Sequence, residues 1–289
     1  MNDNILSFFI FQKIRGQRYN FYGNKMKTAK KCYFRQLNNP DMTDPVLQFI
    51  PDIASTNRWL TQEVADSQAR GITFQPFTAI CTDYQAEGHG MGSNRWFSDR
   101  GKNILLSVYF TPRTEAARQF LFNQYFALAT RQFLLDYLPE VAIKWPNDLY
   151  VRGQKIAGIL IEHHLRGDRL DYTIAGIGIN INQDCFPEEI PHPTSLYLET
   201  GQTFPVEALT ASYWQHLRHS FNTFDWQTPI AQNEAYTLQL YQLGEYKSYL
   251  IRGEQCEAAI TGLDDYGQLR LRKRNGEEVV CGFKEIVFL

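Results

Sequence analysis

Hydrophobic positions recur along the chain at two spacings, and these spacings predict where helices and strands lie. A helix is expected over 55–70, because Leu60 and Val64 are four positions apart and Gly71 follows as a stop signal. The run 104–110 is almost continuously apolar, which is typical of a strand covered on both faces. Further strands are expected over 78–82, 141–144, 155–162 and 172–182, and further helices over 114–139 and 206–224.

From about residue 236 the pattern changes to short strand-like segments separated by turn signals. Asn275-Gly276 and the segment 265–267 are typical of tight turns between antiparallel strands. Short strands at such close spacing predict a small barrel. The expected strands are 246–251, 256–261, 267–272 and 278–281. We therefore expect an α/β body followed by an all-β module.

Composition narrows the class of protein without changing this picture. The chain has 289 residues, of which 44% are hydrophobic and 21% charged, as in an ordinary globular protein. Its longest mainly apolar runs are far shorter than the ~20 residues of a membrane helix, so no membrane association is expected. Five cysteines form no C-x-x-C pair, which favours free thiols in a reducing cytoplasm.

The net charge of −2 hides a strong asymmetry. Residues 1–40 contain eight cations against Asp3 alone, a charge of +7, so the remainder must carry −9. A basic arm of this kind could contact nucleic acid or serve as an organelle presequence. It could also be a disordered leader, or upstream codons placed before a start at Met26 or Met42. We favour a disordered leader, because no helix–turn–helix pattern fits the segment.

The predicted strand over 173–182 carries the most informative pattern in the chain. Its alternate residues form an apolar face of Ala175, Ile177, Ile179 and Ile181 and an opposite face of Gly176, Gly178, Asn180 and Asn182. Two glycines on one face usually mark the close approach of a ligand or of another backbone, and the plainer alternative is a tight strand crossing. The neighbouring strand repeats the pattern, with Gly158 expected on the face of Ile156 and Leu160.

A proline turn, Lys144-Trp145-Pro146-Asn147-Asp148, lies just before these glycine-bearing strands. A lone lysine is most often an ordinary solvated charge. Here the lysine precedes a Trp-Pro-Asn-Asp turn, and a simple connection between two strands would not need the polar residues of that turn. The combination favours an anion-binding site in which Lys144 is the mobile cation.

A loop over 84–96 contains glycines at alternate positions, Gly88, Gly90 and Gly92. Such glycines allow backbone N–H groups to turn toward an anion, and Arg95 and Trp96 could add a charge and a flat face for a base. The loop fits neither the Walker pattern nor the dinucleotide-binding fingerprint, so alone it is weak support.

Other kinds of site find little support in the sequence. The pairs His163-His164 and His216–His219 have no Cys or carboxylate at ligand spacing, so no structural metal is expected. Neither a G-x-S-x-G elbow nor an S-x-x-K motif is present, so an acyl-enzyme serine is not indicated.

Taken together, these motifs resemble those of biotin–protein ligases, in that family's order and spacing. The matching segments are Ser55-Thr56-Asn57, the loop 85–96, Lys144–Asp148, Lys155–Leu160, Gly176–Asn180 and the ending Gly282–Ile286. The resemblance covers residues 45–289, and its most specific part is K-W-P-N-D followed by A-G-I-L. It implies an α/β (α+β) fold, with a mixed-sheet catalytic domain over 42–235 and an SH3-like β-barrel over 236–289. Residues 1–41 would be a disordered basic extension.

The resemblance also implies an activity. Biotin and ATP with Mg²⁺ would give biotinyl-5′-AMP and pyrophosphate, and a lysine of a carboxylase's biotin carboxyl carrier domain would then accept biotin. A carboxylate that attacks an α-phosphate needs positioning and charge neutralisation more than a protein nucleophile. Residues 1–44 are too short for the DNA-binding domain of some members, so no specific operator is expected. The protein would be cytoplasmic, as a monomer or homodimer.

The resemblance assigns roles residue by residue. Lys144 would be the catalytic residue, at the biotin carboxylate and the α-phosphate. Biotin's ring would contact Ser55, Thr56, Asn57 and Gln85, and its acyl end would be covered by His89, Gly90 and Met91. The pocket floor would be Gly158, Gly176 and Gly178. The nucleotide would contact Arg95, Trp96 and Asn180.

The chain departs from the family pattern in the loop, which is typically rich in arginine. Here the corresponding positions are His89 and Met91, and Arg95 and Lys102 are candidates to replace the lost charge. Two alternatives stay open. One is a lipoate or octanoyl ligase or transferase of the same fold, against which K-W-P-N-D and A-G-I-L argue. The other is a non-catalytic biotin sensor, supported only by the lost arginines.

Overall fold

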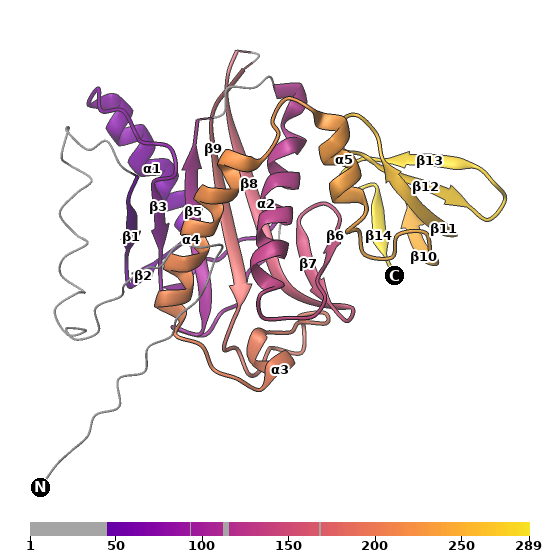
Figure 1. The fold of residues 1–289 in the computed structure, drawn as a ribbon, viewed down its shortest axis with the longest axis horizontal. Helices are drawn as coiled ribbons and strands as arrows, with labels where there is room; N and C mark the ends of the chain where they lie inside the picture. The colour runs from indigo at the N-terminus through magenta and orange to yellow at the C-terminus, as the bar shows by residue number, and fades with distance from the viewer. Residues whose placement is uncertain (1–44, 93, 112–115, 168) are drawn as a thin grey trace, which may run out of the picture.

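A mixed seven-stranded sheet forms the centre of the molecule (Figure 1). The computed structural model describes residues 45–289 except 93, 112–115 and 168, so the basic extension 1–41 lies outside the described residues. Strand β1 pairs with β3 in parallel, and the other neighbouring pairs are antiparallel. The order across the sheet is β1 (Leu47–Phe49), β3 (Ala79–Cys81), β5 (Asn103–Phe110), β9 (Arg169–Asn180), β8 (Gln154–Arg166), β7 (Asp148–Val151) and β6 (Ala142–Lys144).

Helices cover both faces of this sheet. On one face α1 (Thr56–Ala69) packs Leu60 and Val64 against Tyr109 and Ile174. The other face is covered by α2 (Phe120–Leu134) and α4 (Val206–Thr223), which run across the same side of the sheet in Figure 1. Every residue of β5 is buried, which confirms a strand covered on both faces. None of the described helices is long and apolar enough to cross a membrane.

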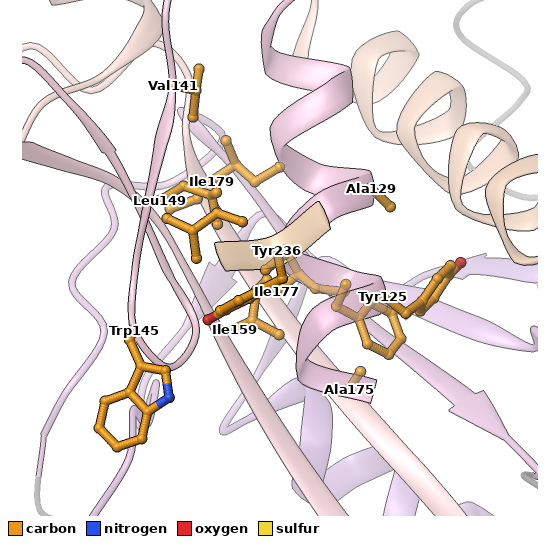
Figure 2. Close-up of a cluster of buried hydrophobic side chains, with 14 of the residues drawn as sticks. Tyr125, Ala129, Val141, Trp145, Leu149, Ile159, Ala175, Ile177, Ile179 and Tyr236 are labelled. Carbon is orange, nitrogen blue, oxygen red and sulfur yellow. The ribbon is translucent and has the colours of Figure 1, made fainter. Parts of the chain in front are cut away.

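The core between the sheet and α2 is shown in Figure 2. Ile159, Ile177 and Ile179 come from the sheet, and Tyr125 and Ala129 from α2. The alternation predicted for the strand over 173–182 is therefore confirmed on its apolar face. Burial of these branched side chains fixes which face of β9 points away from the core, and that face carries the glycines.

Helix α1 begins as predicted, whereas α2 differs from the expectation. Ser55 caps α1 by accepting a hydrogen bond from Arg58 N, so this helix begins where its cap predicts. In contrast, α2 begins at Phe120, after a short 3-10 turn (Ala116–Arg118), and the expected start at residue 114 lies outside the described residues. It is buried on nearly all sides, because α4 and α5 (Pro229–Thr237) pack on it as well as the sheet.

Several short elements were not predicted. Strand β7 lies inside the segment expected to be a plain turn and connection, and it pairs with β6 as a hairpin. Strands β2 (Asp52–Ile53) and β4 (Tyr84–Gln85) form a small parallel pair, and α3 (Leu196–Thr200) is a single short helix. The expected common face of Ile156 and Gly158 is wrong, because one extra residue in β8 shifts the register between Lys155 and Ala157.

The C-terminal strands form a separate antiparallel sheet at one end of the molecule (Figure 1). Its order is β13 (Glu278–Cys281), β12 (Leu269–Lys273), β11 (Glu254–Leu263), β10 (Tyr246–Ile251) and β14 (Ile286–Phe288). The first four correspond to the predicted strands, and β14 is additional. We call residues 244–289 the C-terminal barrel from here on.

The C-terminal barrel is bound closely to the body. The segment before it runs beside β6, with Ile143 N donating to Gln239 O at 2.8 Å and Tyr241 N donating to Ile143 O at 2.9 Å. A Cβ on Gly267 would lie 2.1 Å from the ring of Phe120, so a barrel turn is pressed directly against α2. Buried side chains of both parts belong to one continuous hydrophobic cluster.

Candidate active site

A cavity of about 350 Å³ lies over the glycine-bearing part of β8 and β9, on the face that α1 covers further along the sheet. The loop 85–96, the turn Lys144–Asp148 and the end of the C-terminal barrel form its walls. All of the predicted site residues except Asn180 line it: Ser55, Thr56, Asn57, Gln85, His89, Gly90, Met91, Arg95, Trp96, Lys144, Gly158, Gly176 and Gly178. Segments spread over most of the described chain thus meet at one place.

The glycines of the floor make room for side chains of the protein itself. Gly158 and Gly178 lie opposite each other on β8 and β9. A Cβ on Gly178 would lie 2.3 Å from the indole of Trp96, and one on Gly176 would lie 2.3 Å from Asn57 Oδ1. The sequence suggested close approach by a ligand or a backbone, whereas here the close approach is made by these two side chains.

Trp96 lies against this floor with an unused hydrogen-bond donor. Its indole is close to both Gly158 and Gly178, and Lys155 Nζ lies 5.8 Å from the ring centroid. The indole Nε1 is buried and has no hydrogen-bond partner among the described residues. A buried N–H without an acceptor costs free energy, which makes this atom a candidate donor to a bound molecule.

The end of the cavity next to α1 is tied together by side-chain hydrogen bonds. Gln85 Oε1 accepts from Thr56 N at 2.7 Å and from Thr56 Oγ1 at 3.0 Å. Asn57 Oδ1 accepts from Ser107 Oγ at 2.6 Å, and Asn57 Nδ2 donates to Glu162 Oε2 at 2.7 Å. The polar atoms of Asn57 are therefore already engaged by the protein, which makes this residue a fixed part of the wall.

The glycine loop is a narrow hairpin attached to α1. Trp96 N donates to Gly88 O at 2.9 Å, and Gly90 N donates to Asn94 O at 2.8 Å. Arg58 of α1 reaches the loop, with its Nη1 2.7 Å from Glu87 Oε2 and its Nη2 3.0 Å from His89 Nε2. A guanidinium can only donate, so His89 Nε2 is the acceptor in this contact.

Lys144 points its ammonium between aromatic rings. Its Nζ donates to the Tyr150 hydroxyl at 3.2 Å and lies 4.9 Å from the ring centroids of Tyr150 and Phe288. Burial lowers the pKa of Lys144, with Asp148 acting in the opposite direction and Lys155 adding to the decrease. No carboxylate of the described residues lies within ion-pair distance of Lys144, because Asp148 pairs with Lys155 at 2.7 Å.

Each residue of the turn Lys144–Asp148 makes a different contact. Trp145 Nε1 donates to Gly267 O at 2.9 Å, and its indole stacks on Phe283 at 5.1 Å between ring centroids. Pro146 O accepts from the Tyr236 hydroxyl at 2.7 Å, and Asn147 Nδ2 donates to Ile159 O. The turn therefore joins the cavity, the neighbouring strand β8 and the C-terminal barrel.

Sequence reasoning missed several residues of the cavity. Asp148 and Lys155 line it as an ion pair, and Phe283, Lys284 and Phe288 reach it from the C-terminal barrel. Lys155 could have been found from the sequence, because it opens the strand that carries Gly158. The barrel residues could not, since strand alternation does not show which end of a barrel touches the body.

Two predicted positions lie away from the cavity wall. Asn180 is only 4% exposed, and its Nδ2 donates to Thr194 O at 2.9 Å. Its Oδ1 is buried without a partner among the described residues, so this acceptor remains available. Lys102 does not line the cavity, because its ammonium pairs with Asp99 at 3.1 Å and Asp184 at 2.5 Å. Asp99, Asp184 and Cys185 are the described residues whose ligand atoms lie close enough together to hold a metal ion. The Lys102 ammonium already pairs with both aspartates of this group.

Comparison with known proteins agrees with this arrangement. The model of the biotin/lipoate A/B protein ligase family matches residues 52–180, which include the loop, the turn and both glycine-bearing strands. Over this range the chain is similar to that family. The matched range ends before the C-terminal barrel, so the barrel's part in the cavity is seen only in the structure.

Individual relatives are named as ligases. The bifunctional ligase/repressor BirA of Bacillus spizizenii is 29% identical over 238 residues, which are 78% of this chain and 69% of that protein. The biotin–[acetyl-CoA-carboxylase] ligase of Paracoccus denitrificans is 29% identical over 148 residues, 49% of this chain and 60% of the relative. The biotin protein ligase of Aquifex aeolicus in complex with biotin and ATP has the same fold, with a TM-score of 0.68 at 23% identity over 84% of this chain and 98% of that one.

Proposed function

We propose that this protein is a biotin–protein ligase. It would activate biotin with ATP and transfer it to a lysine of a biotin carboxyl carrier domain. The observation that carries the proposal is the single cavity in which the family's turn lysine, glycine loop and glycine-bearing strands meet. A relative named biotin–[acetyl-CoA-carboxylase] ligase and a matching fold solved with biotin and ATP support the same activity.

The reaction needs no protein nucleophile. An oxygen of the biotin carboxylate attacks the α-phosphorus of ATP, the bond from that phosphorus to the bridging oxygen breaks, and pyrophosphate leaves. The ε-amine of the carrier lysine then attacks the acyl carbon of biotinyl-5′-AMP, and AMP leaves with the electron pair of the broken C–O bond. The protein's task is to hold two anions together and to stabilise the charge that moves.

We assign the end of the cavity next to α1 to the ring of biotin. Gln85 lines the cavity and is oriented by Thr56, which donates twice to its Oε1 and leaves its amide nitrogen without an acceptor among the described residues. Ser55 and Thr56 lie at the first turn of α1 and add short polar groups. Asn57 acts as a wall braced by Ser107 and Glu162, and Gly176 gives it room.

We assign the reacting carboxylate and α-phosphate to the neighbourhood of Lys144. Its ammonium is half-buried beside two aromatic rings and has no carboxylate partner among the described residues. A bound anion would therefore be attracted to a charge that no carboxylate of the protein already neutralises. The loop residues His89, Gly90, Met91 and Arg95 would lie over this region.

The unpaired buried atoms fit a purine nucleotide. Among the described residues, Trp96 Nε1 in the cavity wall is a donor without an acceptor, and Asn180 Oδ1 outside that wall is an acceptor without a donor. Adenine offers both an exocyclic amine and ring nitrogens that could satisfy such atoms. Mg²⁺ would arrive with ATP as part of the substrate. Asp148 is the only carboxylate among the described cavity residues and is paired with Lys155, so the metal would rely on phosphate and water ligands.

The proposal also covers the domain limits, the protein substrate and the cellular location. We place the catalytic domain at 42–235 and the SH3-like barrel at 236–289, with the carrier domain of a biotin-dependent carboxylase as the protein substrate. The four described cysteines, Cys81, Cys185, Cys256 and Cys281, are free thiols, which supports a cytoplasmic location.

The test is a defined labelling reaction. The purified chain is incubated with biotin, MgATP and an apo carrier domain, and the mass of the carrier is measured. Addition of one biotin that requires MgATP is the expected result. Modification by lipoate or octanoate in place of biotin would contradict the proposal, as would biotin binding without any pyrophosphate release.

A further inference from the structure

The turn Gly282–Glu285 of the C-terminal barrel holds a lysine in an unusual backbone conformation. Lys284 has φ +74°, in the left-handed region that favours glycine. A residue with a long side chain is costly there, and such positions often occur where a side chain serves a binding site. Lys284 also lines the cavity, together with Phe283 and Phe288.

The turn is held by a network that does not involve the Lys284 side chain. Gly282 N donates to Glu285 Oε2 at 2.8 Å, and Glu285 N donates to Gly282 O at 3.2 Å. Arg252 N donates to Glu285 O at 2.7 Å, and the Arg252 guanidinium pairs with the Glu285 carboxylate at 3.2 Å. The ammonium of Lys284 has no ion-pair or hydrogen-bond partner among the described residues, so the network leaves it free to bind a ligand.

The neighbours of Lys284 place it beside the expected reaction centre. Phe283 stacks on Trp145, which directly follows Lys144 in the chain, at an interplanar angle of 19°. Phe288, four positions beyond Lys284, has its ring 4.9 Å from Lys144 Nζ. The barrel segment that carries Lys284 is therefore in contact with the turn that carries Lys144, on both sides of the lysine.

The charges around the cavity leave Lys284 unmatched. The described lining residues include four basic side chains, Arg95, Lys144, Lys155 and Lys284, and one carboxylate, Asp148. That carboxylate pairs with Lys155. Three cations without a carboxylate would suit a ligand that carries several negative charges.

We propose that Lys284 binds the β- and γ-phosphates of ATP, so that the C-terminal barrel supplies a cation in addition to Arg95 of the glycine loop. This inference rests on the proposed ligase function and extends it. When the carboxylate oxygen bonds to the α-phosphorus, the electron pair of the breaking P–O bond goes to pyrophosphate. Lys284 stabilises that leaving charge, while Lys144 acts at the carboxylate and the α-phosphate.

The test compares three variants of the full chain with a matched control. Lys284→Ala removes the charge, Lys284→Gly removes both the charge and the backbone strain, and Lys284→Arg keeps the charge. The control is Lys247→Ala, which removes a barrel lysine that pairs with Glu245 at 3.0 Å and does not line the cavity. For each protein we would measure biotin-dependent pyrophosphate release at varied MgATP, biotin affinity, and inhibition by pyrophosphate and by AMP.

We expect Lys284→Ala and Lys284→Gly to lower the efficiency with MgATP about tenfold, as the loss of one charged hydrogen bond predicts. Inhibition by pyrophosphate should weaken equally, whereas biotin affinity and inhibition by AMP should stay within about twofold, because neither ligand has β- and γ-phosphates. Lys284→Gly should melt no lower than the wild type. Lys284→Arg should keep most of the activity, and Lys247→Ala should behave as the wild type.

Two outcomes would overturn the inference. In one, the wild type releases pyrophosphate but Lys284→Ala and Lys284→Gly keep its MgATP and pyrophosphate constants. In the other, AMP inhibition falls as much as pyrophosphate inhibition, which would mean a general disturbance of the site. If the wild type itself forms no biotinyl-5′-AMP, the proposed function fails first and this inference falls with it.

Discussion

The two ends of the cavity are built differently. At the end next to α1, Thr56 donates to Gln85, and Asn57 is hydrogen-bonded to Ser107 and Glu162, so these side chains are already held in place by the protein. At the other end Lys144 and Lys284 have no carboxylate partner among the described residues, and Trp96 Nε1 has no acceptor. A preformed end can select an uncharged ring by shape and hydrogen bonds. An end with unmatched cations is completed only by an anion.

Removal of the Lys144 side chain should have the largest effect, and this effect should be confined to the cationic end of the cavity. Lys144→Ala should slow adenylate formation about 10²–10³-fold, because a preorganised charge is lost where the transition state needs it. Biotin affinity should fall much less, since Ser55, Thr56 and Gln85 remain. Lys144→Arg should not restore the full rate, because a planar guanidinium does not replace a point charge. The measurement is pyrophosphate release together with biotin binding for both variants.

Lys102→Ala is the matched control, because Lys102 pairs with Asp99 and Asp184 outside the cavity. It should adenylate biotin at nearly the wild-type rate. An unchanged rate in Lys144→Ala would remove Lys144 from the mechanism and leave Arg95 as the next cation to test.

The pH dependence of adenylation gives a second signature of the same residue. Burial lowers the pKa of Lys144, so its ammonium is lost on raising the pH earlier than that of an exposed lysine. The rate should therefore decline at alkaline pH as this proton is released. In Lys144→Arg the residual rate should not show that decline, because arginine stays protonated. A decline of the same shape in both proteins would assign it to another group.

A pair of glycine substitutions sharpens the difference between the ends. Gly176→Ala and Gly178→Ala each place a Cβ 2.3 Å from a neighbouring side-chain atom. Gly176 faces the braced Asn57, so that substitution should destabilise the fold by about 1–3 kcal/mol. Gly178 faces Trp96, which can turn into the cavity, so this substitution should reduce ATP-dependent activity with a smaller loss of stability.

Thermal melting and pyrophosphate release on both variants provide the comparison. The double variant with Gly178→Ala and Trp96→Ala should melt closer to the wild type than Gly178→Ala does, because the clash is removed. Equal losses of stability in the two single variants would show that the ends do not differ in rigidity.

A smaller effect is expected from adding charge to the loop. Met91 is 39% exposed and lines the cavity, so Met91→Arg places a cation near the proposed phosphate region. The affinity for MgATP should rise up to about fivefold, the range of an exposed ion pair, and biotin affinity should not change. Measurement at low and high salt would distinguish a charge effect, because only a charge effect is screened by salt. A gain that survives high salt would point to packing.

The smallest change in activity should come from loosening the contact between the glycine loop and α1. Arg58 pairs with Glu87 and contacts His89, but the pair is well exposed, at 59% and 53%. Arg58→Ala should therefore alter ATP use only a few-fold, by loosening the hairpin. Steady-state rates at varied MgATP would measure it, with Arg218→Ala on α4 as a control. A loss as large as that of Lys144→Ala would mean that Arg58 itself serves the reaction.

Much of the fold follows from local pattern. Helix α1 begins at its serine cap, and the apolar run that forms β5 is buried along its whole length. The opposite faces of β9 were also predicted, because alternation is a property of the strand itself. These features depend on neighbouring residues in the sequence, so the sequence is enough to find them.

The remaining features depend on contacts between distant segments. The extra residue near Ile156 is needed only because β7 pairs beside it, and the pairing is not visible in the strand's own pattern. Phe283 and Lys284 reach the cavity because Gly267 and Trp145 fix the barrel against the body. The position of Asn180 outside the cavity wall likewise depends on its bond to Thr194, fourteen positions away.

The contact between the barrel and the turn Lys144–Asp148 has a practical consequence for engineering. Trp145 buries its indole against Phe283 and donates to Gly267, so a shortened ligase ending before the barrel would leave a large aromatic surface and an N–H without cover. Such a fragment should aggregate on expression instead of yielding a smaller labelling reagent. Attempts to miniaturise this protein as a tool would do better to redesign that contact surface than to cut it away.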